Sequence, residues 1–192
     1  MAGNRPTTGL NVHTVQEATN LISQRAVIRV NATLAAAAIS GTAGDVLINR
    51  QEIPNAVLNP GGCSGLTATY LVDYDDVTTD EDFVVIFHQV SAADFGTADA
   101  TANISDANIK LSKLLGLQNW DNSSSSTVQN IDNARFLQLE PSSGGTGSVP
   151  SLLLQAEEGS TSVYFSVIQT ATSGATPDWD TGDLEFVFHI EY

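Results

Sequence analysis

Alternation of apolar and polar residues with a period of two is the dominant pattern of the chain. It is clearest in residues 25–34 and 184–192, where apolar side chains occupy every second position. Because successive side chains of a strand point to opposite faces, this alternation predicts β-strands with one buried face. The predicted core faces are formed by Ile28, Val30, Ala32 and Leu34 in the first segment, and by Leu184, Phe186, Phe188, Ile190 and Tyr192 in the last.

Six further segments have the composition or the alternation of strands, and turn-forming residues separate them. They are residues 45–53, 66–74, 83–90, 134–139, 152–155 and 162–169. In residues 66–74 the alternation predicts one face that is formed by Leu66, Ala68, Tyr70, Val72 and Tyr74.

Two pairs of these segments are predicted to form hairpins. Residues 66–74 are expected to pair with residues 83–90 across the acidic loop 75–82. Residues 152–155 are expected to pair with residues 162–169, because Glu157-Glu158-Gly159-Ser160 between them is a good turn sequence. About eight strands with little helix predict an all-β fold, an antiparallel β-sandwich of the jelly-roll type.

Helical signals occur near the N-terminus. Thr14 and Glu17 have the spacing of a capping box, and apolar residues at helical spacing follow, so we expect a short helix over residues 15–23. Residues 1–13 are rich in Gly, Asn and Thr and predict an extended arm. The predicted organisation is therefore an N-terminal arm, 1–13, and a single β-sandwich domain, 14–192.

A second helical signal lies in residues 105–115. Ser105 is a good N-cap and Gly116 a good terminator, which favours a helix. The alternation of Ile109, Leu111 and Lys113 also fits a strand, and the sequence leaves the two interpretations open.

The charge of the chain excludes several classes of partner. Seven Lys and Arg stand against 22 Asp and Glu, which gives a net charge of −15 among only 15% charged residues. Nucleic-acid binding needs clustered positive charge, so it is disfavoured, as is an anionic membrane surface. The N-terminus has no apolar signal core and no apolar run is long enough to span a membrane, so we expect synthesis in a reducing cytoplasm. The single cysteine, Cys63, excludes a disulfide framework.

The charge is also distributed unevenly. Residues 1–50 hold four arginines and two acids, 4 − 2 = +2, and the rest hold three basic and 20 acidic residues, 3 − 20 = −17. The slightly basic arm could dock on an acidic neighbour, including a second copy, through Arg5, Pro6 and Leu10. A chance distribution of few charges is an equally good interpretation.

No catalytic arrangement stands out, and we expect a non-enzymatic protein. The only histidines are His13, His88 and His189, and no nucleophile elbow of the Gly-x-Ser-x-Gly type occurs. We expect each histidine to be structural or at the surface.

Clustered acids are weak candidates for a calcium site, because Ca²⁺ takes six to eight oxygen ligands from such loops. The candidates are Asp75, Asp76, Asp80 and Asp82 in one loop, and Asp178 and Asp180 in another. Acidic loops that only keep the protein soluble explain the same pattern better, so no cofactor is expected.

Two tryptophans, Trp120 and Trp179, lie in polar sequence that predicts loops. An exposed indole in a loop could anchor a partner protein or stack on a sugar. Alternatively, it could fold back over the end of the sandwich.

Three segments carry a resemblance: Phe83–Gln89, Asp94–Ala100 and Gly159–Tyr164. With the arm and the acidic all-β body, they resemble small virion structural proteins of tailed bacteriophages, of the capsid decoration (cement) type. The resemblance implies a virion protein that binds the major capsid protein and its own copies, with a trimer favoured, and it transfers no functional residue. A phage tail tube or fibre subunit, or a calcium-assisted carbohydrate-binding sandwich, are the alternatives.

Overall fold

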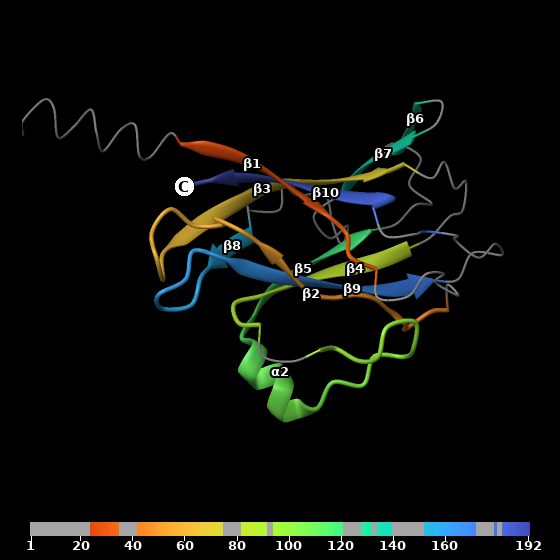
Figure 1. The fold of residues 1–192 in the computed structure, drawn as a ribbon, viewed down its shortest axis with the longest axis horizontal. Coiled ribbons are helices and arrows are strands. Elements are labelled where there is room, and N and C mark those ends of the chain that lie inside the picture. Colours follow the sequence, from red (N-terminus) through yellow and green to blue (C-terminus); the bar gives the residue numbers. More distant parts are fainter. Residues whose placement is uncertain are drawn as a thin grey trace, which may run out of the picture.

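Two antiparallel β-sheets pack face to face in the computed structural model of the chain (Figure 1). The structure describes residues 24–34, 42–74, 82–91, 94–120, 128–131, 134–139, 152–171, 179 and 182–192. The predicted arm, 1–13, and the predicted helix, 15–23, lie outside these residues. No helix in the described ranges is both long and apolar enough to cross a membrane.

One sheet has six strands, and β3 is at its centre. The order is β1-β10-β3-β7-β6, and β8 pairs with the same edge of β3 as β7. The strands are β1 (Arg25–Asn31), β3 (Cys63–Asp73), β6 (Val128–Ile131), β7 (Ala134–Leu139), β8 (Leu152–Gln155) and β10 (Leu184–Glu191).

The other sheet has four strands in the order β2-β9-β4-β5. They are β2 (Val46–Ile53), β4 (Asp82–His88), β5 (Leu114–Trp120) and β9 (Val163–Ala171). A loop segment and one short helix, α2 (Asp106–Ser112), lie below this sheet in Figure 1.

The strand pairs are nested in the sequence. The first strand pairs with the last (β1 with β10), β2 pairs with β9, β3 with β8, and β4 with β5. A long hairpin rolled across two sheets gives this order, which is that of an eight-stranded jelly roll. Strands β6 and β7 are additions at the edge of β3. The all-β jelly-roll prediction is confirmed.

The core between the sheets holds the faces that the alternation predicts for the first and last strands. Val30, Ala32 and Leu34 are buried on and after β1. Along β10 the buried core residues are Leu184, Phe186, Phe188 and Ile190, while Ile28 and Tyr192 pack against the core in part. Phe165 of β9 lies 5.1 Å from Phe186 and 5.3 Å from Phe188, measured between ring centroids, so aromatic contacts join the two sheets.

Both predicted hairpins are wrong. β3 lies in the six-stranded sheet and β4 in the other, and β8 and β9 are divided in the same way. The turn after β8 is present, since Ser160 N–H donates to the Glu157 carbonyl over 2.9 Å, but it connects the two layers. Turn signals predict where the chain reverses direction. In this jelly roll, however, most strands pair with a strand that lies far away in the sequence.

The predicted face of residues 66–74 is also wrong beyond its first member. Leu66 is buried, but the buried side chains then change to Thr69, Leu71 and Asp73. Opposite the step from His189 to Ile190, β3 carries one extra residue, Thr67. Such a β-bulge shifts the alternation by one position, so Tyr70 and Val72 point away from the core.

The structure resolves the open interpretation of residues 105–115 by showing both elements. Ser105 caps α2 by accepting a hydrogen bond from Asn108 N–H, and the helix ends at Lys113, which has a left-handed φ of 51°. Strand β5 begins at the next residue. Gly116 therefore lies within a strand and does not terminate the helix.

Candidate interaction surface

Aromatic side chains run diagonally across the outer face of the six-stranded sheet. We define the outer face as the side that points away from the four-stranded sheet. Tyr70 of β3 lies between His189 of β10, at a ring-centroid distance of 5.0 Å, and Phe136 of β7, at 5.2 Å. The register pairs Val187 with Tyr70 and Val72 with Phe136, so these rings are diagonal neighbours on adjacent strands.

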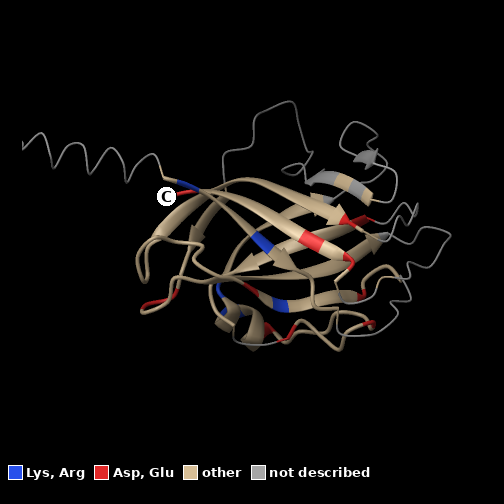
Figure 2. Ribbon diagram, turned by 45° about the horizontal axis from the view of Figure 1, so that its top comes forward, with Lys and Arg blue, Asp and Glu red and all other residues tan. Residues whose placement is uncertain are grey.

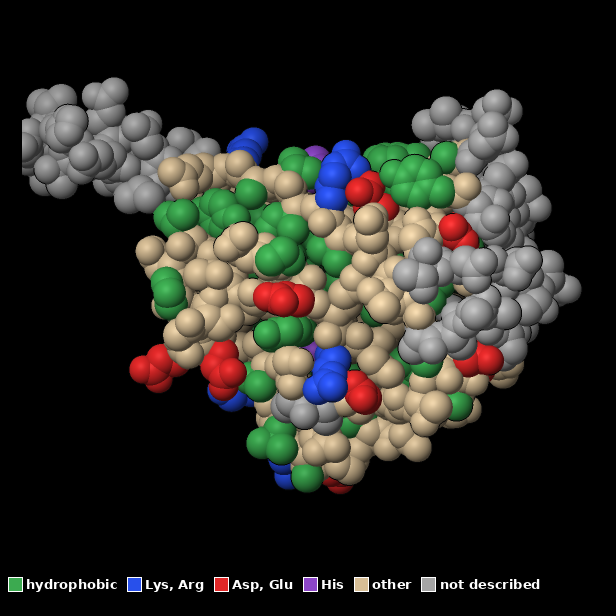
Figure 3. Space-filling model, in the orientation of Figure 1, with side chains coloured by type: hydrophobic (Ala, Val, Ile, Leu, Met, Phe, Trp, Pro, Cys, Tyr) green, Lys and Arg blue, Asp and Glu red, His purple; other side chains and the backbone are tan. Residues whose placement is uncertain are grey.

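The outer face is unusually rich in exposed apolar side chains. It carries four of the eight large hydrophobic residues that are exposed in the described part of the chain: Val27 (57%), Leu153 (61%), Phe136 (37%) and Tyr74 (50%). A single exposed apolar residue needs no explanation, but a group on one sheet face is typical of a contact surface. Figure 3 shows hydrophobic side chains beside an acid–base pair along the top, over this sheet.

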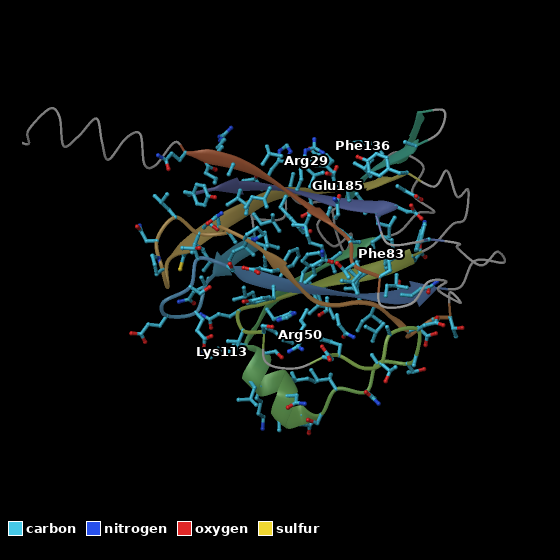
Figure 4. The ribbon with its side chains drawn as sticks, viewed as in Figure 1. Arg29, Arg50, Phe83, Lys113, Phe136 and Glu185 are labelled. Carbon is cyan, nitrogen blue, oxygen red and sulfur yellow. The ribbon has the colours of Figure 1, made fainter. Side chains whose placement is uncertain are left out.

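Ion pairs divide the apolar residues of the outer face. Arg29 donates to Glu185 at 2.6 Å, and Arg25 lies 3.4 Å from Glu191. Figure 4 shows Arg29 and Glu185 at the outer side of the sheet near Phe136. The Tyr74 hydroxyl donates to the same Glu185 carboxylate at 3.2 Å. Burial, with the negative charge of Glu185, raises the pKa of Tyr74 above its usual value of 10.0. The face is thus close to neutral although the whole chain is strongly acidic.

The remaining cations of the described part are spread over the molecule (Figure 2). Arg50 pairs with Asp94 at 2.8 Å, and Lys113 lies 3.9 Å from Glu157. Lys110 is in the last turn of α2, where it interacts favourably with the helix dipole. Among the side chains that the structure describes, there is therefore no cluster of free cations that would bind phosphate.

Trp179 is placed in the interior. Its side chain is only 4% exposed, and its indole N–H donates to the buried carboxylate of Asp73 over 3.3 Å. The expectation of an exposed indole is therefore wrong for Trp179, and the alternative, in which it folds back onto the sandwich, describes it. A buried polar group that is hydrogen bonded contributes to the fold, and this indole offers no surface to a partner or a sugar.

The other predicted site residues are described only in part. Trp120 does not lie in a loop, since its backbone ends β5 opposite Phe83, and its side chain lies outside the described residues. Asp82 is the only calcium candidate within the described residues, half-buried at the start of β4. Among the described residues no group of three or more potential ligands could hold a metal ion. Outside the described residues lie Arg5, Pro6, Leu10, Asp75, Asp76, Asp80, Asp178 and Asp180.

His88 and Ser166 are the one histidine–serine pair that the described residues bring together. His88 Nε2 lies 3.2 Å from Ser166 Oγ, and His88 Nδ1 lies 3.0 Å from the Val90 carbonyl. Ser166 Oγ also accepts from Arg50 N–H at 2.9 Å. A neutral ring with its proton on Nδ1 donates to the Val90 carbonyl, and its Nε2 accepts from the Ser166 hydroxyl. Every group in this hydrogen-bond network then has a partner.

This pair is structural. Both side chains are fully buried, and the ring nitrogen that a catalytic acid would orient is bonded to a backbone carbonyl. Burial lowers the pKa of His88 below 6.5, and the charge of Arg50 acts in the same direction, whereas the hydrogen bond to Val90 opposes it. The prediction of a structural His88 agrees with this geometry.

The strand order and the two-sheet core place the chain in the class of jelly-roll proteins. No protein-family model and no curated protein matches it. Among solved structures, the chain is similar to a chain of the semi-empty virus-like particle of Macrobrachium rosenbergii nodavirus, with a TM-score of 0.34 and 12% identity over 88% of this chain and 94% of that one.

A second similar structure is the full particle of Israeli acute paralysis virus, heated to 63 degrees, with a TM-score of 0.29 and 10% identity over 100% of this chain and 82% of that one. Similarities at such low TM-scores do not assign a function to this chain.

Proposed function

We propose that the chain is a structural protein of a virus particle and acts through protein–protein contacts made by the outer face of its six-stranded sheet. The observation that carries the proposal is the group of apolar side chains on that face. Val27, Tyr70 and Phe136 follow one another across the sheet, with His189 between the first two, and Leu153 lies apart from them on β8. The face is built on paired strands, so a partner would meet a surface that is already ordered. Little conformational entropy would then be lost on binding.

The composition of the outer face is that of an interface. Aromatic residues and arginine are enriched in protein–protein contacts, and isolated charges are depleted from their centres. Here the arginines are paired with glutamates within the face, so covering it would bury few uncompensated charges. Elsewhere the net charge of −15 would keep the protein from adhering to packaged nucleic acid.

Within this class, we assign the chain to capsid decoration (cement) proteins of a tailed bacteriophage. The sequence resemblance and the predicted arm support this finer assignment. The partners would be the major capsid protein and further copies of the chain, with a trimer favoured. In this role the chain would add contacts that hold neighbouring capsid proteins together, and its location would be the virion.

The structure affects the two alternatives differently. A tail tube or fibre subunit would use the same kind of surface. The carbohydrate-binding alternative is weakened, because Trp179, one of its two stacking residues, is buried.

The experiment is co-sedimentation of the recombinant chain with empty shells of the major capsid protein that the same genome encodes. Val27→Glu and Leu153→Glu place a charge on the outer face at positions that are more than half exposed, so the fold tolerates them. Leu111→Glu is the matched control, because Leu111 is 59% exposed on α2, away from this face.

We expect the two outer-face variants to lose at least tenfold in affinity and the control to bind as the unmodified chain does. Equal binding by all three variants would contradict the proposal, and binding to tail tubes instead of shells would move the chain to the alternative within the virion class.

A further inference from the structure

Residues 94–103, which we call the cover segment, lie on the side of the four-stranded sheet that faces away from the six-stranded sheet (Figure 1). Phe95 is the one large apolar residue of this segment and is only 4% exposed. Its ring lies 5.6 Å from the ring of His88, and the Tyr164 ring of β9 stacks on the same imidazole at 6.1 Å, both measured between centroids. His88 is therefore enclosed by two other rings and is fully buried.

The second half of the cover segment is held by the backbone. Val46 N–H donates to the Ala100 carbonyl at 3.0 Å, and Asp99 N–H donates to the Val46 carbonyl at 3.0 Å. Ala102 N–H donates to the Gly44 carbonyl at 2.9 Å. Residues 98–102 are thus joined to the start of β2 in the manner of a short additional strand.

The first half, which contacts His88, is attached to the sheet by side chains. The Asn49 amide accepts from Phe95 N–H and donates to the Gly96 carbonyl, each at 2.9 Å. Arg50 pairs with Asp94 at 2.8 Å, but the two side chains are 41% and 53% exposed, so water screens the pair and its contribution is small. Residues 94–96 can therefore leave the sheet at a lower cost than residues 98–102.

The site of His88 suits a neutral ring and not a charged one. A proton on Nε2 would face Ser166 Oγ, which already accepts from Arg50 N–H and would have to turn its own hydrogen away from the ring. The hydrogen bonds of the ring go to Ser166 and to the Val90 carbonyl, and neither is a carboxylate.

Charged and titratable groups lie on the elements around the ring. They are Arg50 and Glu52 of β2, Asp94 of the cover segment, Tyr164 of β9, and Lys113 and Glu157, which pair with each other. The nearest cation, Arg50, opposes a second positive charge, and Asp94 is already paired with it. A buried charge without a partner is costly, so a charged His88 would be stabilised by access to water.

Water can reach the ring by two routes. Separation of β4 from β9 would break a ladder that runs along both strands in the centre of the sheet. Release of residues 94–96 breaks only the side-chain attachments of Asn49 and Arg50. The second route costs less.

We propose that residues 94–96 are an acid-operated cover, which protonation of His88 releases from the sheet while residues 98–102 stay paired and act as the hinge. The release exposes Phe95 and the surface beneath it. This device lies on a different sheet from the outer face and does not depend on the proposed function.

The direction and size of the effect follow from proton linkage. In the closed form burial lowers the pKa of His88 below 6.5, whereas the hydrated ring of the open form has the ordinary value. The open form therefore binds protons more readily, and its share rises as the pH falls. Between pH 7.5 and pH 5.5 the ratio of open to closed molecules should increase by about five- to tenfold.

Amide hydrogen exchange, followed by NMR on the full chain, measures this opening. The two reporters are Phe95 N–H, which donates to Asn49, and Asn103 N–H, which donates to the Phe95 carbonyl at 2.9 Å. After correction for the intrinsic effect of pH on exchange, we expect their protection to fall by about five- to tenfold from pH 7.5 to pH 5.5.

Low concentrations of urea distinguish local opening from unfolding of the whole chain. Local release exposes little surface, so the protection of both reporters should not change with urea, whereas the amide of Phe188 in the central strand β10 should lose protection. Protection of the reporters that does not change with pH would overturn the proposal. So would exchange of Phe95 and Asn103 with the same urea dependence as Phe188.

Three variants complete the test. His88→Gln cannot take up the proton and should abolish the pH response of the two reporters. Asp94→Asn leaves His88 in place and loosens the cover, so protection should be about two- to fivefold lower at both pH values. Asp106→Asn, the same change in the first turn of α2, is the matched control and should leave protection unchanged. A pH response that persists in His88→Gln, or equal protection in Asp94→Asn and Asp106→Asn, would overturn the proposal.

Discussion

Phe136 of β7 stacks on Tyr70 of β3, with ring centroids 5.2 Å apart and an interplanar angle of 26°. The contact lies on the outer face of the sheet and adds to the hydrogen-bond ladder that joins the added strand β7 to β3. Phe136 nevertheless remains 37% exposed. The same ring is thus available both to the fold and to a partner, and this double role gives the first prediction.

Phe136→Leu removes the ring and keeps an apolar side chain. We expect the free energy of unfolding to fall by about 0.5–1.5 kcal/mol, because an aromatic pair contributes that much beyond the apolar area it buries. Chemical denaturation measures the change. Phe136→Tyr, which retains the stack, should cost less, and equal stability of the two variants would show that the stack contributes nothing.

His88 predicts a pH dependence of stability. Its pKa in the folded protein is lowered below 6.5, mainly by burial. Between the lowered pKa and 6.5 the unfolded chain binds more protons than the folded protein, so stability falls as the pH falls through this range. We expect the midpoint of urea unfolding to decrease steadily from pH 7.5 to pH 5.5.

His88→Gln isolates the contribution of His88 from that of the other titratable groups. The variant is less stable at neutral pH, because it disturbs the bond to Ser166, but its midpoint should change less between pH 7.5 and pH 5.5. A slope equal to that of the unmodified chain would mean that the pH dependence comes from other groups.

The burial of Trp179 predicts its fluorescence. In a Trp120→Phe variant, where Trp179 is the only indole, we expect blue-shifted emission and little quenching by acrylamide, because the side chain is 4% exposed. Strong quenching would place the indole at the surface and revive the carbohydrate-binding alternative. Addition of calcium should change neither the emission nor the melting temperature.

Deletion of residues 1–13 tests the predicted arm. The described sandwich begins at residue 24, so the shortened chain should keep its melting temperature. Under the decoration assignment it should no longer bind capsid shells. Shell occupancy equal to that of the full chain would show that the arm is not needed for binding, and the outer face would remain as the binding surface.

The sequence predicts strands well where one face is buried throughout. β1 and β10 follow their alternation, since Val30 and Phe186 point into one continuous core. β3 departs from its pattern at a single inserted residue, Thr67, and no composition signal marks a bulge. The hairpin predictions fail for a related reason: the partner of β3 is chosen by contacts formed far along the chain, and local turns do not encode them.

The candidate surface could be predicted only in part. Val27 is an apolar residue on the otherwise polar side of an alternating strand, so it can be recognised from the sequence alone. The Tyr70–Phe136 contact could not be expected, because the sequence pattern assigned Tyr70 to a different face and gave no register for β7. Trp179 shows the converse case, in which a residue in polar sequence is drawn inward by a buried acceptor, Asp73.

The most direct measurement of the central claim is a cryo-electron microscopy map of capsid shells with the chain bound. The account predicts that the outer face of the six-stranded sheet, at Val27, Tyr70 and Phe136, contacts a neighbouring protein of the shell. A map in which the chain is bound with this face open to solvent, or in which the chain does not bind shells, would contradict it.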